Sequence, residues 1–213
     1  MSLFDYWDLF GSEILRLLWR HLILVAVSMA AATTVGVAIG IAVAKDRRFG
    51  FLVPVANTVQ AAPELVLLAI AIPFLGIGFK AALIALFAKG VLPILRNTYS
   101  GLTQVDPATL EAARGMGFSP RQRFLRIELP LAAPAILTGV RVAAVMLVSV
   151  LTLSAYISVD SLGTLIVQGI ARMDFNALFT GSALTALFAV VLNYGLLIIE
   201  QRLARLTSQP EAN

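Results

Sequence analysis

Two ionisable residues stand inside otherwise apolar stretches of the chain, and their chemistry is the first question that the sequence raises. Glu64 and Lys89 lie in consecutive hydrophobic segments, where a charge costs about 2.5 to 3.5 kcal/mol at the centre of a membrane helix. An ion pair between the two side chains would neutralise both charges and fix one segment against the other. The alternative is that the Glu64 carboxylate faces a solute pathway and attracts a cationic ammonium group. We expect the pair and keep the pathway as the alternative.

The other side chains offer little further chemistry. Asn57 and Gln60 could line a pathway beside Glu64, although polar residues in membrane helices commonly serve helix packing. A single histidine, His21, no cysteine and no cluster of carboxylates leave no evident metal site or catalytic set. The pattern G-x-x-x-x-G-K-[ST] is missing from the sequence, so the chain has no phosphate loop of that kind to hold ATP. We therefore expect neither an enzyme nor a cofactor bound by this chain.

The composition is that of a membrane protein. Of the 213 residues 59% are hydrophobic and 13% are charged, and the mean hydropathy is +0.90, which is far more apolar than a soluble domain of this size. The net charge of +4 would suggest nucleic acid as a partner in a soluble protein. Most basic residues here flank apolar segments, so membrane topology explains them better and the expected partner is a lipid bilayer.

Five apolar segments approach the length of about 20 residues that a membrane-spanning helix needs, which predicts an all-α membrane protein with a single transmembrane domain. Three spans fall within residues 22–97 and two within residues 134–199; they are Leu22–Ala44, 51–75, 79–95, Pro134–Tyr156 and Ala177–Ile199.

Three polar segments complete the chain. Residues 1–21 show helical spacing of apolar residues and are expected to form a separate helix on the outer surface, with His21 as an interfacial residue at its end. Residues 98–133 form a loop between the third and fourth spans, and residues 200–213 form a tail.

The basic residues predict how these spans are oriented. With the N-terminus outside, eleven lysines and arginines fall on the cytoplasmic side and four on the outer side. The cytoplasmic set is Lys45, Arg47, Arg48, Arg96, Arg114, Arg121, Arg123, Arg126, Arg141, Arg202 and Arg205, and the outer set is Arg16, Arg20, Lys80 and Arg172. This excess on one side follows the positive-inside rule and places the 98–133 loop and the C-terminus in the cytoplasm.

The loop carries the signals of two short helices. Asp106 is a suitable N-cap, Pro107 suits the first helical position, and Gly117 stands where a left-handed C-terminal cap is expected. We therefore predict a first helix from Asp106 to Met116. Its small residues predict a shallow face that could dock into a groove of a partner; they are Ala108, Ala112 and Ala113.

A second start signal follows at once. Ser119, Pro120 and Gln122 match a capping box with proline in the first turn. The second helix is predicted to end before Pro130, because proline in a helix interior removes a hydrogen bond and clashes with the preceding turn.

The same loop resembles the signature of permease subunits of bacterial ABC importers of the type I, methionine-permease-like fold. The pattern is E-A-A, three residues, G, nine residues, I, one residue, L-P, and it is met by Glu111, Ala112, Ala113, Gly117, Ile127, Leu129 and Pro130. The resemblance implies that this is the coupling loop, seated in a cleft of a separate ATPase subunit. It also implies that an ATPase dimer binds the ATP and magnesium, that a second permease subunit, identical or homologous, completes the pathway, and that an extracytoplasmic protein delivers the solute at the inner membrane of a bacterium.

A narrower resemblance concerns the solute. The runs "RNTYSGL", "VDP", "GMG" and "PFLGIG" are similar to permeases of the osmoprotectant branch, which import quaternary ammonium compounds such as glycine betaine, choline and carnitine. One departure is "ISVDSLG" at Ile157–Gly163, where such permeases tend to read I-G-A-G-G-L-G, so the outer gate or the docking surface for the binding protein is expected to differ. The alternatives are an importer of methionine or a polar amino acid, and a self-sufficient channel or secondary carrier.

Overall fold

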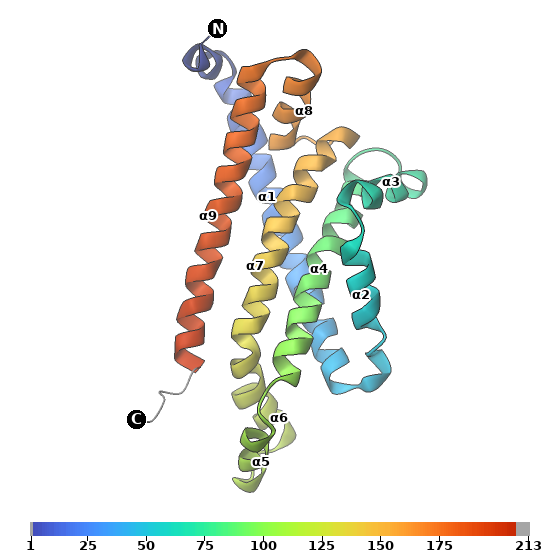
Figure 1. Ribbon diagram of the computed structural model, residues 1–213, viewed down its shortest axis with the longest axis vertical. Helices are drawn as coiled ribbons and strands as arrows, with labels where there is room; N and C mark the ends of the chain where they lie inside the picture. Colours follow the sequence, from blue (N-terminus) through green and yellow to red (C-terminus); the bar gives the residue numbers. More distant parts are fainter. Residues whose placement is uncertain (1, 208–213) are drawn as a thin grey trace.

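The computed structural model describes residues 2–207, and these residues fold into a bundle of helices (Figure 1). The predicted all-α class is confirmed. In chain order the elements are α1 (Leu3–Lys45), η1 (Arg47–Phe49), α2 (Leu52–Ala61), α3 (Glu64–Leu75), α4 (Phe79–Thr103), α5 (Pro107–Gly115), α6 (Pro120–Arg123), η2 (Phe124–Glu128), α7 (Leu129–Leu153), η3 (Ser154–Ile157), α8 (Leu162–Arg172) and α9 (Phe175–Thr207).

The first helix is longer than we predicted. Residues 1–21 are not a separate surface helix, because α1 runs unbroken for 43 residues, or about 65 Å. Ser2 starts it with a capping box to Asp5, and no proline interrupts the 43 residues that follow. His21 is not an interfacial residue either, since it is fully buried and its Nδ1 accepts a hydrogen bond from the Leu162 backbone N–H at 3.3 Å.

The second predicted span is broken in two. Helices α2 and α3 meet at an angle of 102°, with Pro63 between them. Proline has no N–H to donate and disfavours a helical conformation in the residue before it, here Ala62, which is extended. The span predicted over residues 51–75 is therefore present as two helices with a sharp bend at Pro63.

The remaining predicted spans correspond to long helices. By length and apolar composition, the described residues include three helices able to cross a membrane, within α1, within the helix that includes α7, and within α9; the bent pair α2–α3 makes a fourth if it is counted as one span. Helix α4 has 25 residues and lies against both α1 and α7. The contact with α1 is close because a Cβ atom at Gly40 would lie only 2.5 Å from the Cβ of Thr98.

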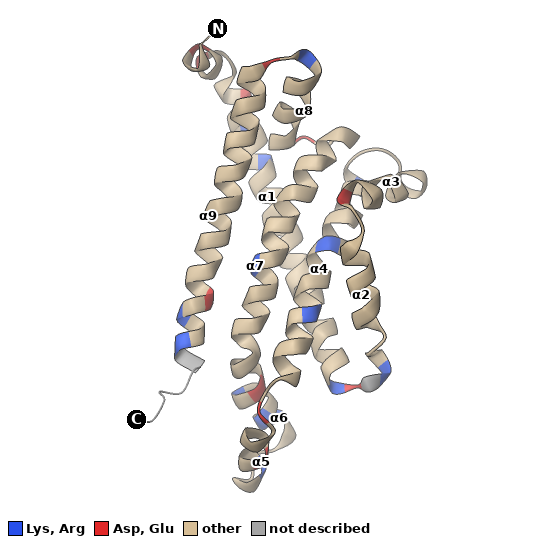
Figure 2. Ribbon diagram, viewed as in Figure 1, with Lys and Arg blue, Asp and Glu red and all other residues tan. Residues whose placement is uncertain are grey.

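The two ends of the bundle differ in what they carry. We call the end with α5 and α6 the loop end, and the opposite end, with the start of α1, α3 and α8, the far end (Figure 1). Lys, Arg, Asp and Glu gather towards these two ends, with few charged residues between them (Figure 2). The described C-terminal part of α9 lies towards the loop end, so the two ends of the described chain lie at opposite ends of the bundle.

The sequence analysis missed α8, which fills part of the predicted connection between the last two spans. Ser161 caps it, with the Ser161 side chain accepting from the Gly163 N–H and the Thr164 side chain accepting from the Ser161 N–H. Gly163 packs directly on the backbone of α7, where a Cβ atom would collide with the Thr152 carbonyl.

Candidate functional site

The first helix of the loop forms as its sequence predicts. Asp106 Oδ1 accepts a hydrogen bond from the Ala108 N–H at 3.0 Å, and Pro107 occupies the first turn of α5. These two residues satisfy or remove backbone donors that a helix start leaves unpaired. Helix α5 therefore begins at a fixed residue.

Gly117 closes the same helix in the left-handed conformation that we predicted, with φ of 81°. The Gly117 N–H donates to the Arg114 carbonyl at 3.0 Å, and the Phe118 N–H donates to the Ala113 carbonyl at 3.1 Å. These two bonds are those of a Schellman motif, which satisfies the last carbonyls of a helix. The turn between α5 and α6 is thus fixed by the backbone conformation of one glycine.

The second helix starts as predicted but does not stop where we expected. Ser119 and Gln122 form the capping box, yet the helix continues from α6 through the π-helical segment η2 into α7, without a break at Pro130. In η2 the Leu129 N–H bonds to the Phe124 carbonyl, five residues back. This wider turn changes the hydrogen-bond register just before Pro130, where the missing N–H would otherwise leave a gap. The predicted end before Pro130 was therefore wrong.

The signature residues divide into an exposed and a buried group. Ala113 is fully buried, and Ile127 and Leu129 are partly buried. The exposed members are Glu111, Ala112, Gly117 and Pro130. Ala113 therefore packs within the chain and is not part of the shallow docking face that we predicted; that face is limited to Ala112 and the exposed Ala108.

Two charged contacts hold the loop, one within the loop and one to the end of α1. Arg123 Nε donates to Glu128 Oε1 at 2.7 Å, which fastens α6 to η2. Lys45 Nζ lies 3.6 Å from the centre of the Phe124 ring, a cation–π contact between the end of α1 and η2. The loop is therefore joined to α1 through Lys45 and runs directly into α7.

Lys89 does not pair with Glu64. Its side chain is 4% exposed, and its Nζ donates to the backbone carbonyls of Gln60 at 2.9 Å and Ala62 at 2.7 Å. These carbonyls are free because the helix breaks at Pro63, and the end of a helix attracts a positive charge. No ion pair within residues 2–207 joins Glu64 and Lys89, so the predicted pair was wrong.

Glu64 instead lies in the first turn of α3 and is partly buried. Its Oε2 accepts a weak hydrogen bond from Ser149 Oγ of α7 at 3.4 Å. Of the other candidates, Gln60 meets Lys89 through its backbone, and Asn57 is exposed on α2. The structure brings Gln60 to Lys89, and it leaves Asn57 and the Glu64 carboxylate outside that contact.

Comparison with known proteins places this arrangement in a family. Residues 32–209 match the family described as "Binding-protein-dependent transport system inner membrane component". The chain belongs to this family. The predicted resemblance is confirmed, and the chain is a multi-pass inner membrane component of a transport system.

Individual relatives agree. The chain is 40% identical over 184 residues to the "Osmoprotectant import permease protein OsmY" of Salmonella typhimurium, covering 85% of this chain and 78% of that one. It is 33% identical over 194 residues to the "Choline transport system permease protein OpuBB" of Bacillus subtilis, covering 91% and 89% of the two chains. In fold it is similar to the MetNI methionine ABC transporter, with a TM-score of 0.79, 21% identity and coverage of 98% of this chain and 100% of that chain.

A polar cluster that sequence analysis missed joins α7 to α9 in this inner membrane component. Arg141 Nε donates to Glu200 Oε2 at 2.8 Å, and its Nη1 donates to Asn193 Oδ1 at 3.3 Å. Thr138 Oγ1 completes the cluster by donating to Glu200 Oε1 at 2.9 Å. The residues are 52 to 62 positions apart in sequence, so no local pattern could have revealed the contact.

We expect Arg141→Met to lower the free energy of unfolding by about 3 kcal/mol, because the Glu200 carboxylate, whose side chain is 17% exposed, would lose its cation. Thermal unfolding of the purified protein in detergent measures the loss. Arg202→Met, which removes an exposed arginine on α9, is the control and should change stability by less than about 0.5 kcal/mol. Equal melting temperatures for both variants would contradict the assignment.

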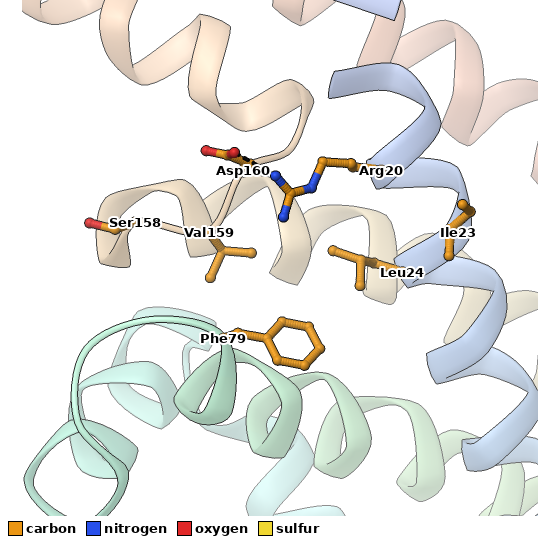
Figure 3. Close-up of a pocket in the computed structure, with 7 residues that line it drawn as sticks. All are labelled: Arg20, Ile23, Leu24, Phe79, Ser158, Val159 and Asp160. Atoms are coloured by element: carbon orange, nitrogen blue, oxygen red, sulfur yellow. Dashed lines mark hydrogen bonds and ion pairs between the residues drawn. The ribbon is translucent and has the colours of Figure 1, made fainter. Parts of the chain in front are cut away.

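At the far end, the segment that departs from the family pattern holds α1 by charge. Asp160 Oδ2 accepts from Arg16 Nη1 at 3.2 Å and from Arg20 Nη1 at 2.7 Å. Figure 3 shows Arg20 turned towards Asp160 at the edge of a cavity of about 430 Å³, with Leu24 and Phe79 also lining it. The charged groups are roughly half exposed, so the pairs orient the segment more than they stabilise it.

Proposed function

We propose that this chain is the transmembrane permease subunit of an ATP-driven importer for small quaternary ammonium osmoprotectants such as choline, carnitine and glycine betaine. The observation that carries the proposal is the rigidly capped helix α5, which presents Glu111 and Ala112 at the loop end of a bundle from this family. The solute class is supported by relatives 32 to 40% identical that are named as osmoprotectant, choline or carnitine permeases.

We propose three kinds of partner for this subunit: an ATPase dimer, a second permease subunit and a binding protein. An ATPase dimer, which binds ATP and magnesium, would seat α5 in its clefts, and a second permease subunit, identical or homologous, would complete the pathway. An extracytoplasmic binding protein would deliver the solute, in agreement with the family description. A relative in Helicobacter pylori, named as both an ergothioneine transport permease and an ergothioneine binding protein, supports this pairing of permease and binding protein.

We place the loop end in the cytoplasm, with the N-terminus outside and the C-terminus inside. The exposed arginines Arg114, Arg121 and Arg126 lie on the loop, in keeping with the positive-inside rule. With this orientation the far end faces the binding protein.

The continuous helix from Pro120 to Ile157 explains how a movement at the loop would reach the far end. It has 38 residues, or about 57 Å, and it passes from the loop through α7 to η3. Closure of the ATPase dimer would push α5 and α6, and this helix would carry the displacement to the α8 region, where Asp160 holds α1. The solute would then be exposed to one side of the membrane at a time.

Reconstitution tests the proposal. The chain would be placed in liposomes with an ATPase subunit and a binding protein from the same organism that assemble with it, and uptake of labelled choline, carnitine, glycine betaine and methionine would be measured with and without ATP. We expect ATP-dependent uptake of at least one quaternary ammonium compound and none of methionine. Uptake of methionine alone would contradict the solute class, and uptake without ATP would favour a secondary carrier.

A further inference from the structure

The Glu64 carboxylate lies beside the break between α2 and α3, and the Lys89 ammonium at the same break binds backbone carbonyls instead of this carboxylate. The Lys89 ammonium donates to two backbone carbonyls at 2.7 and 2.9 Å. Glu64 meets only the neutral hydroxyl of Ser149, at 3.4 Å, and no ion pair of the described residues includes it. Its place in the first turn of α3 favours a negative charge but supplies no counter-ion. A carboxylate within a membrane bundle is costly unless water or a cation reaches it.

The hydroxyl that Glu64 contacts also borders a cavity. Ser149 lines a cavity of about 420 Å³ between α7, α8 and α9, a volume within the usual range for small-molecule sites. Its other polar lining residues are Thr152, Ser182 and Thr185, and the remaining walls are apolar. Thr152 and Thr185 donate their hydroxyl hydrogens to their own helices, so the cavity is mainly apolar, and the Glu64 carboxylate lies behind Ser149 at its wall.

These surroundings match the chemistry of a quaternary ammonium group. Such a group carries a positive charge inside a shell of methyl groups and has no N–H to donate, so it needs a negative charge and apolar contact, and it needs no set of acceptors. A primary ammonium needs acceptors for its hydrogens, and the Lys89 site, with two carbonyls, shows what the chain provides for one. The Glu64 site adds a full negative charge beside mainly apolar walls, and a methylated cation can use both.

We propose that Glu64 binds the cationic group of the solute during translocation, with Ser149 between the carboxylate and the cavity. This inference rests on the proposed function and names the residue that recognises the solute class. The break at Pro63 places the carboxylate, because α3 begins at Glu64 and Lys89 holds the end of α2. Discontinuous helices form solute sites in other transporters for the same reason, since they turn side chains and helix ends towards the pathway.

The test uses single cysteines, which this chain permits because it contains none of its own. In the reconstituted complex, Ser149→Cys would be labelled with a trimethylammonium-ethyl methanethiosulfonate and with the anionic sulfonate-ethyl reagent of similar size. We expect the ratio of the cationic to the anionic rate to exceed that of a free thiol by about tenfold, to fall to the free-thiol value when Glu64→Gln is added, and choline to protect the cysteine. The control Glu13→Gln, at an exposed carboxylate on α1, should leave the ratio unchanged.

Uptake measurements on the same preparations test the importer function separately from the role of Glu64. If the wild-type complex imports a quaternary ammonium compound, Glu64→Gln should lower its uptake about tenfold while Glu64→Asp retains most of it. An unchanged labelling ratio, or unchanged uptake in Glu64→Gln, would overturn the role of Glu64 and leave the importer standing. Failure of Glu64→Gln to assemble would show a structural residue and overturn the inference, and a wild-type complex that imports none of these compounds would overturn both proposals.

Discussion

Gly117→Val is expected to reduce ATP-driven uptake about tenfold while leaving the helices inserted in the membrane. The residue has φ of 81°, which strains any side chain that branches at Cβ by about 2 kcal/mol or more. No atom lies within 4 Å of a Cβ built at this position, so the effect would come from the backbone and not from a clash. The Schellman bonds to Arg114 and Ala113 would be lost, and α5 would no longer be held at a fixed angle to α6.

Gly195→Val is the control, because a Cβ at Gly195 also meets nothing within 4 Å and the residue lies within helix α9, outside the loop. Valine is a better helix former than glycine, so this variant should keep full uptake. The measurements are uptake, ATP hydrolysis stimulated by the binding protein, and the amount of complex in the membrane. Equal uptake by the two variants would show that the left-handed turn is not needed for coupling.

The contrast between this loop and the membrane core explains what could be predicted from the sequence. The caps at Asp106, Gly117 and Ser119 depend on residues within five positions of one another, so their types alone predict the conformation. The family signature adds the partner, which no local pattern could give. The π-helical turn that carries the chain past Pro130 was beyond prediction, because proline both ends helices and occurs in them where the hydrogen-bond register changes.

The predicted pair of Glu64 and Lys89 failed for a different reason. We expected the two side chains to meet because they lie in consecutive apolar segments, but the bend of 102° at Pro63 turns α3 away from the direction of α2. The bend also creates the acceptors that Lys89 uses, since it frees the carbonyls of Gln60 and Ala62. Sequence showed that a charge was buried there, but only the path of the backbone decides which group neutralises it. The same holds for Asp160 and its two arginines, which are more than 100 positions apart in sequence.

Lys89→Met is expected to lower the free energy of unfolding and ATP-driven uptake together. It would remove two charge-assisted hydrogen bonds and leave two partly buried carbonyls at the end of α2 without that donor, at a cost of about 3 kcal/mol. Lys89→Gln should lose less, because its amide keeps a donor, although its shorter side chain reaches less far. Thermal unfolding in detergent and the yield of folded protein measure these losses. Lys80→Met, at an exposed lysine near the start of the same helix, is the control and should be close to wild type.

Comparing Lys89→Met with Glu64→Gln also distinguishes a charge that stabilises the bundle from a charge that binds the solute. If Lys89 fixes the break and Glu64 faces the solute, Lys89→Met should lower stability and uptake together, whereas Glu64→Gln should lower uptake and leave the melting temperature within about 2 °C of wild type. A stable Lys89→Met variant would mean that water reaches the freed carbonyls and that the break does not depend on the lysine. Equal destabilisation by the two variants would instead indicate that the two charges act together, as in the ion pair that the sequence first suggested.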